Sequence, residues 1–276
     1  MRAECSAIAD VLKEPYRPGH GCRDEEPLQA ALNALYDYRD DPETKVLHRS
    51  RLNLFHALMS RLVARGTVRR FDRALDVGCN AGYYSKMLSD LGFRDVLGVD
   101  IEPAFIEKAN AHFGSEVAGR RRSFEVRNAE RLDSPGAFDF ILCTEVIEHT
   151  SRPEQVIAGL ASSLAPGGIA VVTLPNRVSI PYRWAMLVHV IKRKPYDPVL
   201  RDHLSWPWTR SVRVLSPYGL ELLETAGTNL FLFGPLLRAL YRKPGFAAIH
   251  HLNDALSSLG PVHRWAQFFF TVWRKP

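Results

Sequence analysis

The fold of this 276-residue chain is decided by Ala74-Leu75-Asp76-Val77-Gly78-Cys79-Asn80-Ala81-Gly82-Tyr83-Tyr84, which Leu97-Gly98-Val99-Asp100 follows. The first stretch is an apolar run that ends in an acidic residue and a glycine turn, and a helical pattern comes after it. The second stretch is another apolar run that ends in Asp. This order predicts a strand, a tight loop, a helix and a second strand, the unit that binds nucleotides at the carboxyl ends of its strands.

Strand and helix patterns alternate over residues 73–174, which predicts a parallel sheet with helices on both faces. The expected strands are 73–77, 93–99, 123–127, 138–143 and 169–174, and the helices between them are 83–91, 103–112 and 153–164. Beyond residue 175 we expect two insertions, at about 177–212 and 234–264, which would form a substrate lid. We also expect a helix over 216–226, a short strand over 230–233 and a final strand over 267–274. Residues 1–45 are expected to be a partly helical extension before a domain of residues 46–276.

The composition favours a globular protein of the cytoplasm. No run approaches the roughly 18 apolar residues of a spanning helix, and the first residues lack the apolar core of a signal peptide. The four cysteines form no C-x-x-C pair, so we expect reduced thiols. The net charge of +6 is spread over short clusters, which is more typical of a solvated surface than of a nucleic-acid site.

The glycine spacing of the loop distinguishes between cofactors. A dinucleotide fingerprint would need G-x-G-x-x-G, whereas the loop has Gly78 and Gly82 with Asn80 between them. Asn tolerates the left-handed backbone conformation better than most residues. The loop resembles the first motif of the class I S-adenosylmethionine (SAM) dependent methyltransferases. The resemblance covers about residues 46–176 and implies a Rossmann-like, seven-stranded, mostly parallel sheet.

The same resemblance implies where SAM is bound. Gly78 and Gly82 would flank its amino acid portion, and Asp76 would orient that region. Asp100 ends the second strand, where a carboxylate can accept hydrogen bonds from the ribose hydroxyls. Asn128 or Ala129 would lie beside the adenine. The complete set of expected cofactor-binding residues is Arg49, Asp76, Gly78, Cys79, Asn80, Gly82, Asp100, Ile101, Asn128, Ala129, Thr144 and Glu145.

An acidic and histidine cluster follows the fourth expected strand. If this segment forms a helix, Glu145, Glu148 and His149 share one face at the mouth of the cleft. The E-x-x-E-H pattern resembles the ubiquinone-biosynthesis O-methyltransferases. It also resembles the small-RNA terminal 2′-O-methyltransferases, which hold Mg²⁺ with a further histidine, here His203. Three roles stay open: structural hydrogen bonding, general-base catalysis by His149 with the two glutamates, and a divalent metal bound by all four residues.

Two further segments bear on the cofactor and the acceptor. Leu47-His48-Arg49 is similar to the L-H-R of the ubiquinone enzymes, and this likeness implies that Arg49 pairs with the cofactor carboxylate. The apolar residues 180–191 run into Lys192-Arg193-Lys194 and fit a lid, a basic amphipathic helix on anionic lipid, or a helix packed on the core. Trp206 and Trp208 would wall a pocket or stack bases.

We therefore predict an enzyme that transfers the methyl group of SAM to an oxygen, in preference to a nitrogen, of a small, fairly apolar acceptor. The second hypothesis is RNA 2′-O-methylation with a Mg²⁺ site, which the positive charge and the set Glu145, Glu148, His149 and His203 favour. The third is a non-catalytic scaffold that keeps the fold. The intact glycine loop and Asp100 argue against this last hypothesis.

Overall fold

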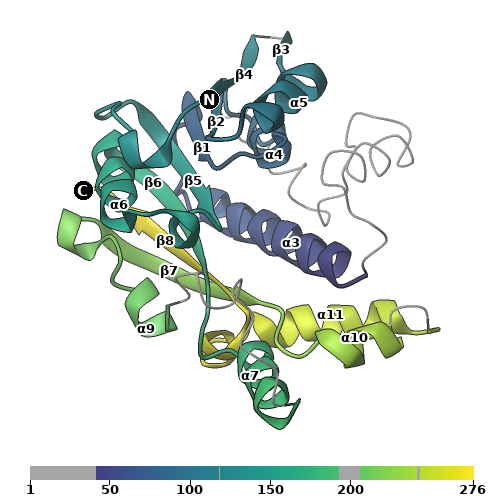
Figure 1. The fold of residues 1–276 in the computed structure, drawn as a ribbon. Coiled ribbons are helices and arrows are strands. Elements are labelled where there is room, and N and C mark those ends of the chain that lie inside the picture. Colours follow the sequence, from purple (N-terminus) through teal and green to yellow (C-terminus); the bar gives the residue numbers. More distant parts are fainter. Residues whose placement is uncertain (1–41, 118, 193–205, 241–242) are drawn as a thin grey trace.

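A twisted sheet forms the centre of the computed structural model, which describes residues 42–117, 119–192, 206–240 and 243–276 (Figure 1). In these residues eight strands pair in the order β3-β4-β2-β1-β5-β6-β8-β7. The strands are β1 Arg73–Val77, β2 Asp95–Asp100, β3 Ser115–Val117, β4 Arg120–Val126, β5 Phe138–Thr144, β6 Leu164–Pro175, β7 Glu221–Thr228 and β8 Phe268–Arg274.

The predicted seven-stranded, mostly parallel sheet is confirmed. Strands β4, β2, β1, β5 and β6 run parallel, and β8 lies antiparallel between β6 and β7. The eighth strand, β3, is a short antiparallel addition to the β4 edge. Because the five central strands run parallel, the loops after them meet at one edge of the sheet, which we call the carboxyl edge.

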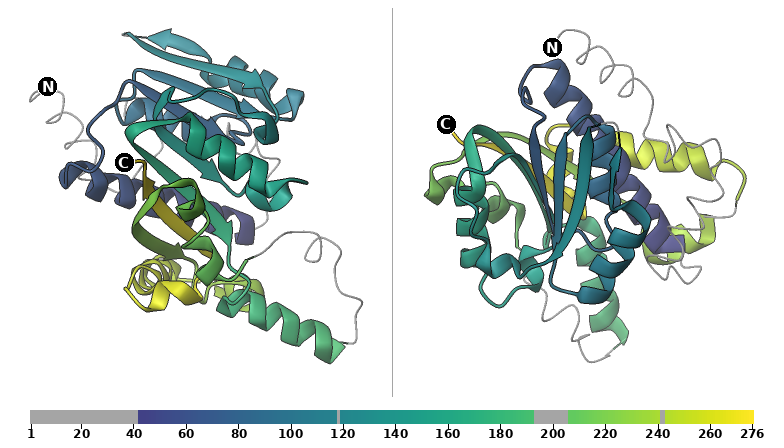
Figure 2. Two further views of the ribbon diagram at one scale, coloured as in Figure 1. Left: turned by 90° about the vertical axis from the view of Figure 1, so that its left-hand side faces the viewer. Right: turned by 90° about the horizontal axis from the view of Figure 1, so that it is seen from above.

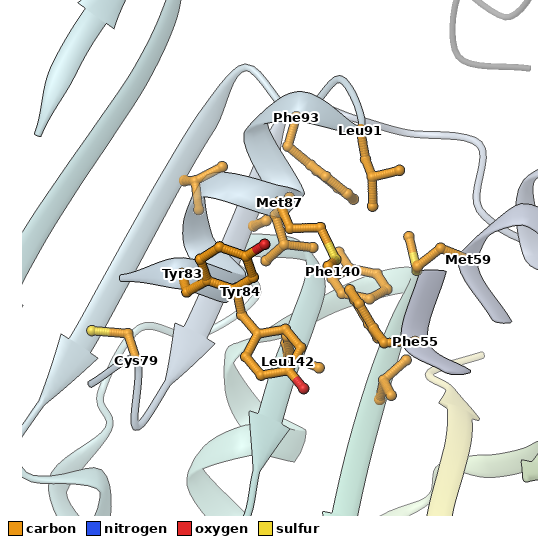
Figure 3. Packing of buried hydrophobic residues seen from close by; sticks show 14 of the residues in the cluster. Phe55, Met59, Cys79, Tyr83, Tyr84, Met87, Leu91, Phe93, Phe140 and Leu142 are labelled. Atoms are coloured by element: carbon orange, nitrogen blue, oxygen red, sulfur yellow. The ribbon is translucent and has the colours of Figure 1, made fainter. Parts of the chain in front are cut away.

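Helices cover both faces of the sheet (Figure 2). One face packs against α3 Pro42–Ala64, α4 Tyr83–Asp90 and α5 Pro103–Phe113, and the other packs against α6 Pro153–Ser163. Successive residues of each strand point to opposite faces, so Phe140 and Leu142 join the first core and Ile141 and Cys143 the second. Figure 3 shows the first core, in which aromatic and methionine side chains of α3 and α4 meet those of β5.

The predicted helix over 216–226 is wrong. The segment forms a short 3-10 turn, η3 Ser216–Tyr218, and then strand β7. Leu222 packs against the core on the α6 face, whereas Leu223 packs against the core on the α3 face. That alternation is the two-residue period of a strand, and pairing with β8 overrides the helix propensity of Glu, Leu and Ala.

The predicted strand over 230–233 is also absent from the described residues. The backbone N–H groups of Leu230, Phe231 and Leu232 all donate to the side-chain oxygen of Asn253 instead. The described parts of the two expected insertions contain helices, namely α7 Ile180–Lys192 and α9 Trp208–Ser211 in the first and α10 Gly234–Leu240, α11 Phe246–Ser257 and η4 Val262–Trp265 in the second.

Helix α11 is tied to α3 by a buried polar contact. Ser50 Oγ lies 2.7 Å from His250 Nε2 and donates to Asp254 Oδ1 at 3.0 Å. The described part of α3 begins at Pro42, ahead of the expected domain boundary at residue 46, and residues 1–41 of the expected partly helical extension lie outside the described residues. None of the described helices has the length and apolarity to cross a membrane.

Candidate active site

The loop after β1 has three residues with positive φ, namely Gly78 at 71°, Asn80 at 47° and Gly82 at 88°. The expected left-handed conformation of Asn80 is therefore confirmed. The N–H groups of Gly78 and Cys79 donate to the carbonyl oxygen of Val99, which fixes the loop against β2. A Cβ on Gly78 would lie 2.2 Å from a methyl carbon of Val146. Glycine is required there both by the backbone angle and by contact with the segment after β5.

Asp76 lies fully buried beneath this loop. One of its carboxyl oxygens accepts a 2.6 Å hydrogen bond from Ser85 Oγ, which joins β1 to the start of α4. Within the described residues its other oxygen, Oδ1, is buried without a hydrogen-bond partner. Burial raises the pKa of Asp76 from 3.8 to about 7, against the opposing effect of the Ser85 hydrogen bond.

Asp100 is half-buried at the end of β2 and is held by two backbone N–H groups. Its Oδ2 accepts from Asn80 at 2.9 Å, and its Oδ1 accepts from Glu102 at 3.0 Å. Each carboxylate oxygen has a second acceptor position, so both can still bind a ligand hydroxyl. Ile101 and Val126, at the ends of neighbouring strands, are 65% and 52% exposed. An oriented carboxylate beside exposed apolar side chains fits the ribose and adenine of SAM.

The segment expected beside the adenine forms the 3-10 turn η1 Ala129–Arg131. Asn128 caps this turn, because its Oδ1 accepts a 2.8 Å hydrogen bond from the N–H of Glu130. The Glu130 carboxylate in turn accepts from the N–H groups of Ser151 and Arg152. The predicted adenine loop is therefore joined to the chain that follows the acidic cluster.

The acidic segment is not a helix at Glu145, so the expected single helical face does not form. Glu145 has φ 54°, and only the 3-10 turn η2 Ile147–His149 follows it. Glu148 is 2% exposed, whereas His149 is exposed to solvent. Glu145 is anchored to β6, because its N–H and its carboxylate both bond to the Thr173 hydroxyl, at 3.1 Å and 2.9 Å. Half-buried Thr144 ends β5.

The four-residue metal site is not assembled in the part of the chain that the structure describes. No group of three His, Cys, Asp or Glu side chains there has an arrangement that could hold a metal ion. His203 lies outside the described residues. Arg49 lies in α3, but its side chain is also outside the described part, so its contact with the cofactor stays a prediction.

Two residues of this region, Arg51 and Thr173, belong to no motif in the sequence. Burial and the charge of Glu145 raise the pKa of Glu148 well above its usual range, and the positive charge of Arg51 on α3 opposes this rise. The guanidinium carbon of Arg51 lies 4.6 Å from the centre of the Phe268 ring. Thr173 anchors Glu145. Each carried a signal: Arg51 interrupts an apolar helical stripe, and Thr173 is the one polar residue in the apolar run 169–174.

Helix α7, which begins shortly after β6 ends, exposes an apolar stripe. Ile180, Trp184, Leu187 and Ile191 recur at helical spacing and are 41%, 47%, 50% and 69% exposed. This face of α7 is therefore not packed on the core. Trp206 is buried under the guanidinium of Arg210, at 3.8 Å from the ring centre, so it is not available to stack a base.

Comparison with known proteins agrees with this geometry. Residues 75–170 match the family model described as a methyltransferase domain. The chain is 33% identical over 117 residues to the ubiquinone biosynthesis O-methyltransferase of Xanthomonas euvesicatoria, and this alignment covers 42% of this chain and 48% of the relative. It is 29% identical over 161 residues to the enzyme of that name from Rickettsia conorii, and this alignment covers 58% of this chain and 53% of the relative. The chain thus spans about half the length of these curated relatives.

The fold comparison extends over the whole chain. The magnesium protoporphyrin IX methyltransferase of Synechocystis PCC 6803, crystallised with bound SAH, aligns with a TM-score of 0.60 and 13% identity. The alignment covers 98% of this chain and 99% of that one. At this identity the match shows the fold, which is the predicted class I methyltransferase fold.

Proposed function

We propose that this chain, which carries a methyltransferase domain on the fold of the SAM-dependent methyltransferases, transfers the methyl group of SAM to an oxygen of a small, fairly apolar acceptor. The observation that carries the proposal is Asp100. Its carboxylate is fixed by the N–H groups of Asn80 and Glu102 at the end of β2, beside a glycine loop with the required left-handed angles. This is a preformed ribose site in the position where such folds bind nucleotides.

The residues around the loop have separate roles in this proposal. Gly78 and Gly82 shape the backbone beside the amino acid portion of SAM, and Asp100 orients the ribose. Exposed Ile101 covers one side of the adenine, and the capped turn at Asn128 closes the other side. SAM itself supplies an electrophilic sulfonium methyl group. The protein aligns the acceptor oxygen with that methyl group and removes one proton.

The acceptor is proposed to bind beyond the carboxyl ends of β5 and β6. Polar side chains there include Thr144, Glu145 and Thr173, and helix α7 adds exposed apolar side chains after β6. This combination supports an apolar molecule with one reactive polar group. The ubiquinone biosynthesis names of the curated relatives are consistent with such an acceptor.

RNA 2′-O-methylation receives less support from the site. In that reaction Glu145 and Glu148 would hold a divalent metal with His149 and His203. Glu148 lies inside the protein, whereas His149 lies on the surface, so the two side chains do not share one exposed face. A purified protein whose turnover is abolished by EDTA and restored by Mg²⁺ would reinstate the metal.

Calorimetry with SAH, the demethylated product, tests the cofactor proposal. The parent protein is expected to bind SAH, and Asp100→Ala is expected to weaken binding at least about tenfold, since it removes hydrogen bonds from a charged acceptor. Asp133→Ala is the matched control, because Asp133 is exposed in the loop before β5. Absence of SAH binding by the folded parent, or equal affinity in the parent and Asp100→Ala, would contradict the proposal.

A further inference from the structure

Helix α7 carries a continuous row of exposed apolar side chains. One stripe along the helix is formed by the residues at i, i+4, i+7 and i+11, namely Ile180, Trp184, Leu187 and Ile191. Val190, which is 71% exposed, borders this stripe. In both views of Figure 2 the helix extends away from the sheet. Single exposed apolar side chains are ordinary, whereas a contiguous group of them marks an interaction surface.

The apolar surface continues onto η4. Arg183 and Val190 are separated by two helical turns, so they lie on the same side of α7. The guanidinium carbon of Arg183 is 5.1 Å from the centre of the Trp265 ring, which places this ring beside that side of the helix. Trp265 is 39% exposed. We use the name α7 surface for the group of Ile180, Trp184, Leu187, Val190, Ile191 and Trp265.

The segments that carry this surface are positively charged. In the described parts of the insertions at 177–212 and 234–264, the one acidic residue is Asp254, which already accepts a hydrogen bond from Ser50. Arg183 and Arg264 are exposed, the first against the ring of Trp265 and the second next to it in the chain. The basic residues of the same parts are Arg177, Arg183, Lys192, Arg210, Arg238, Lys243 and Arg264. The charge therefore fits an anionic partner.

The aliphatic side chains select the kind of anionic partner. Their burial is favourable only in an apolar environment, which the interface of a lipid bilayer offers and a sugar-phosphate backbone does not. Single-stranded nucleic acid would use the cations and the indole rings and leave Ile180, Leu187 and Ile191 in water. A symmetric contact with a second copy would bring the same cations together, with no excess of acidic residues to neutralise them.

The tryptophans also fit a bilayer. Indole rings concentrate at the headgroup level of membranes, because the ring is apolar and its N–H is polar. Trp184 and Trp265 supply two such rings next to a cation that can pair with lipid phosphate. Helix α7 has 13 residues, fewer than the roughly 20 that cross a bilayer, so it would lie along the membrane surface.

We propose that the α7 surface docks on an anionic phospholipid bilayer. The aliphatic side chains of α7 enter the boundary of the acyl chains, and the two indole rings lie at the headgroups. Arg183 and Arg264 pair with lipid phosphates. The inference concerns where the protein binds and does not depend on the methyl-transfer reaction.

The test measures the partitioning of the full chain into vesicles by flotation. The probes are vesicles of mixed phosphatidylglycerol and phosphatidylcholine, and vesicles of phosphatidylcholine alone. The double variant Leu187→Glu, Ile191→Glu is expected to weaken partitioning into the anionic vesicles at least about tenfold, because it loses apolar burial and adds repulsion. The matched control Gln155→Glu, Ser162→Glu adds the same charge at exposed positions of α6 and should stay within about threefold of the parent.

The cations are tested separately from the apolar side chains. Arg183→Gln, Arg264→Gln should weaken partitioning into anionic vesicles by about fivefold for each cation removed, since each contributes attraction to the negative surface. The same variant should match the parent on phosphatidylcholine. Equal losses on the two kinds of vesicle would refute the pairing of these cations with anionic headgroups.

Tryptophan fluorescence reports which face is in contact. Emission from the parent is expected to shift to shorter wavelength when anionic vesicles are added, because Trp184 and Trp265 leave water. The variant Trp184→Phe, Trp265→Phe keeps apolar rings, so it should still bind but lose most of the shift. Trp206 and Trp273 are buried and should not respond. An undiminished shift in this variant would place the contact on another face.

Four results would overturn the inference: no partitioning of the parent into anionic vesicles, equal partitioning of the parent into both kinds of vesicle, parental partitioning of Leu187→Glu, Ile191→Glu, or an equal loss in the α6 control. A concentration-dependent dimer in analytical ultracentrifugation that Leu187→Glu, Ile191→Glu abolishes would assign the α7 surface to a second copy instead. Calorimetry should give parental SAH affinity for this variant, which shows that it is folded. Failure of the folded parent to bind SAH would overturn the proposed function and leave the vesicle result standing.

Discussion

Asp76→Asn is expected to change the pH dependence of stability in a way that measures the cost of burying this carboxyl group. Burial raises the pKa of Asp76 from 3.8 to about 7. A raised pKa in the folded state means that the folded protein holds the proton more tightly than the unfolded chain does. The free energy of unfolding of the parent must then fall as pH rises from about 4 to about 7.

The shift sets the magnitude. The difference between about 7 and 3.8 is about 3 pKa units, and at 1.36 kcal/mol per unit the contribution lost over the complete window is about 4 kcal/mol. At pH 4.5 the unfolded chain is already partly ionised, so about 3 kcal/mol remains to be lost between pH 4.5 and pH 8. Asn is neutral throughout and can still accept the hydrogen bond from Ser85, so the variant lacks this loss.

Urea denaturation without cofactor, followed by circular dichroism at pH 4.5, 6 and 8, gives the comparison. The stability of Asp76→Asn relative to the parent should increase by about 3 kcal/mol from the lowest to the highest pH. Asp133→Asn, at an exposed position, should show no such trend relative to the parent. A difference between Asp76→Asn and the parent that stays constant within about 0.5 kcal/mol over this range would refute the argument that Asp76 is buried and uncharged at low pH.

Two further substitutions test the loop and the second insertion. Gly78→Ala is expected to lower the free energy of unfolding by more than about 1 kcal/mol and to weaken SAH binding, because φ is 71° and Val146 occupies the space of the new Cβ. Gly136→Ala is the control for the backbone angle alone, since Gly136 also has a positive φ but has open space around it. Asn253→Ala is expected to lower the free energy of unfolding, measured by urea denaturation, by at least about 2 kcal/mol, since three backbone N–H groups lose their acceptor. His251→Ala, at an exposed position on the same helix, should lower it by less than about 0.5 kcal/mol. Equal effects of the two substitutions would contradict the role of Asn253.

The cofactor half of the site was predictable because its determinants are local. The positive φ angles of Gly78, Asn80 and Gly82 follow from residue type, and Asp100 follows an apolar strand directly. The bounds of β1 agree with the prediction, since a buried parallel strand appears in the sequence as a short apolar run. The strand β7 was missed because its leucines and glutamates favour a helix, and only pairing with β8 makes it a strand.

The acceptor half depends on contacts between distant parts of the chain, so motif spacing could not define it. The E-x-x-E-H pattern drew attention to His149, yet the turn after β5 buries Glu148 and leaves His149 exposed. Arg51, whose positive charge opposes the rise in the pKa of Glu148 that burial and Glu145 cause, belongs to no motif. It does stand on the helical stripe of Leu47, Leu54 and Leu58. Its guanidinium is held over the ring of Phe268, on the last strand, so only the folded chain brings these two side chains together. A lone charge on an apolar helical stripe can be read from the sequence, whereas the ring that it packs on cannot.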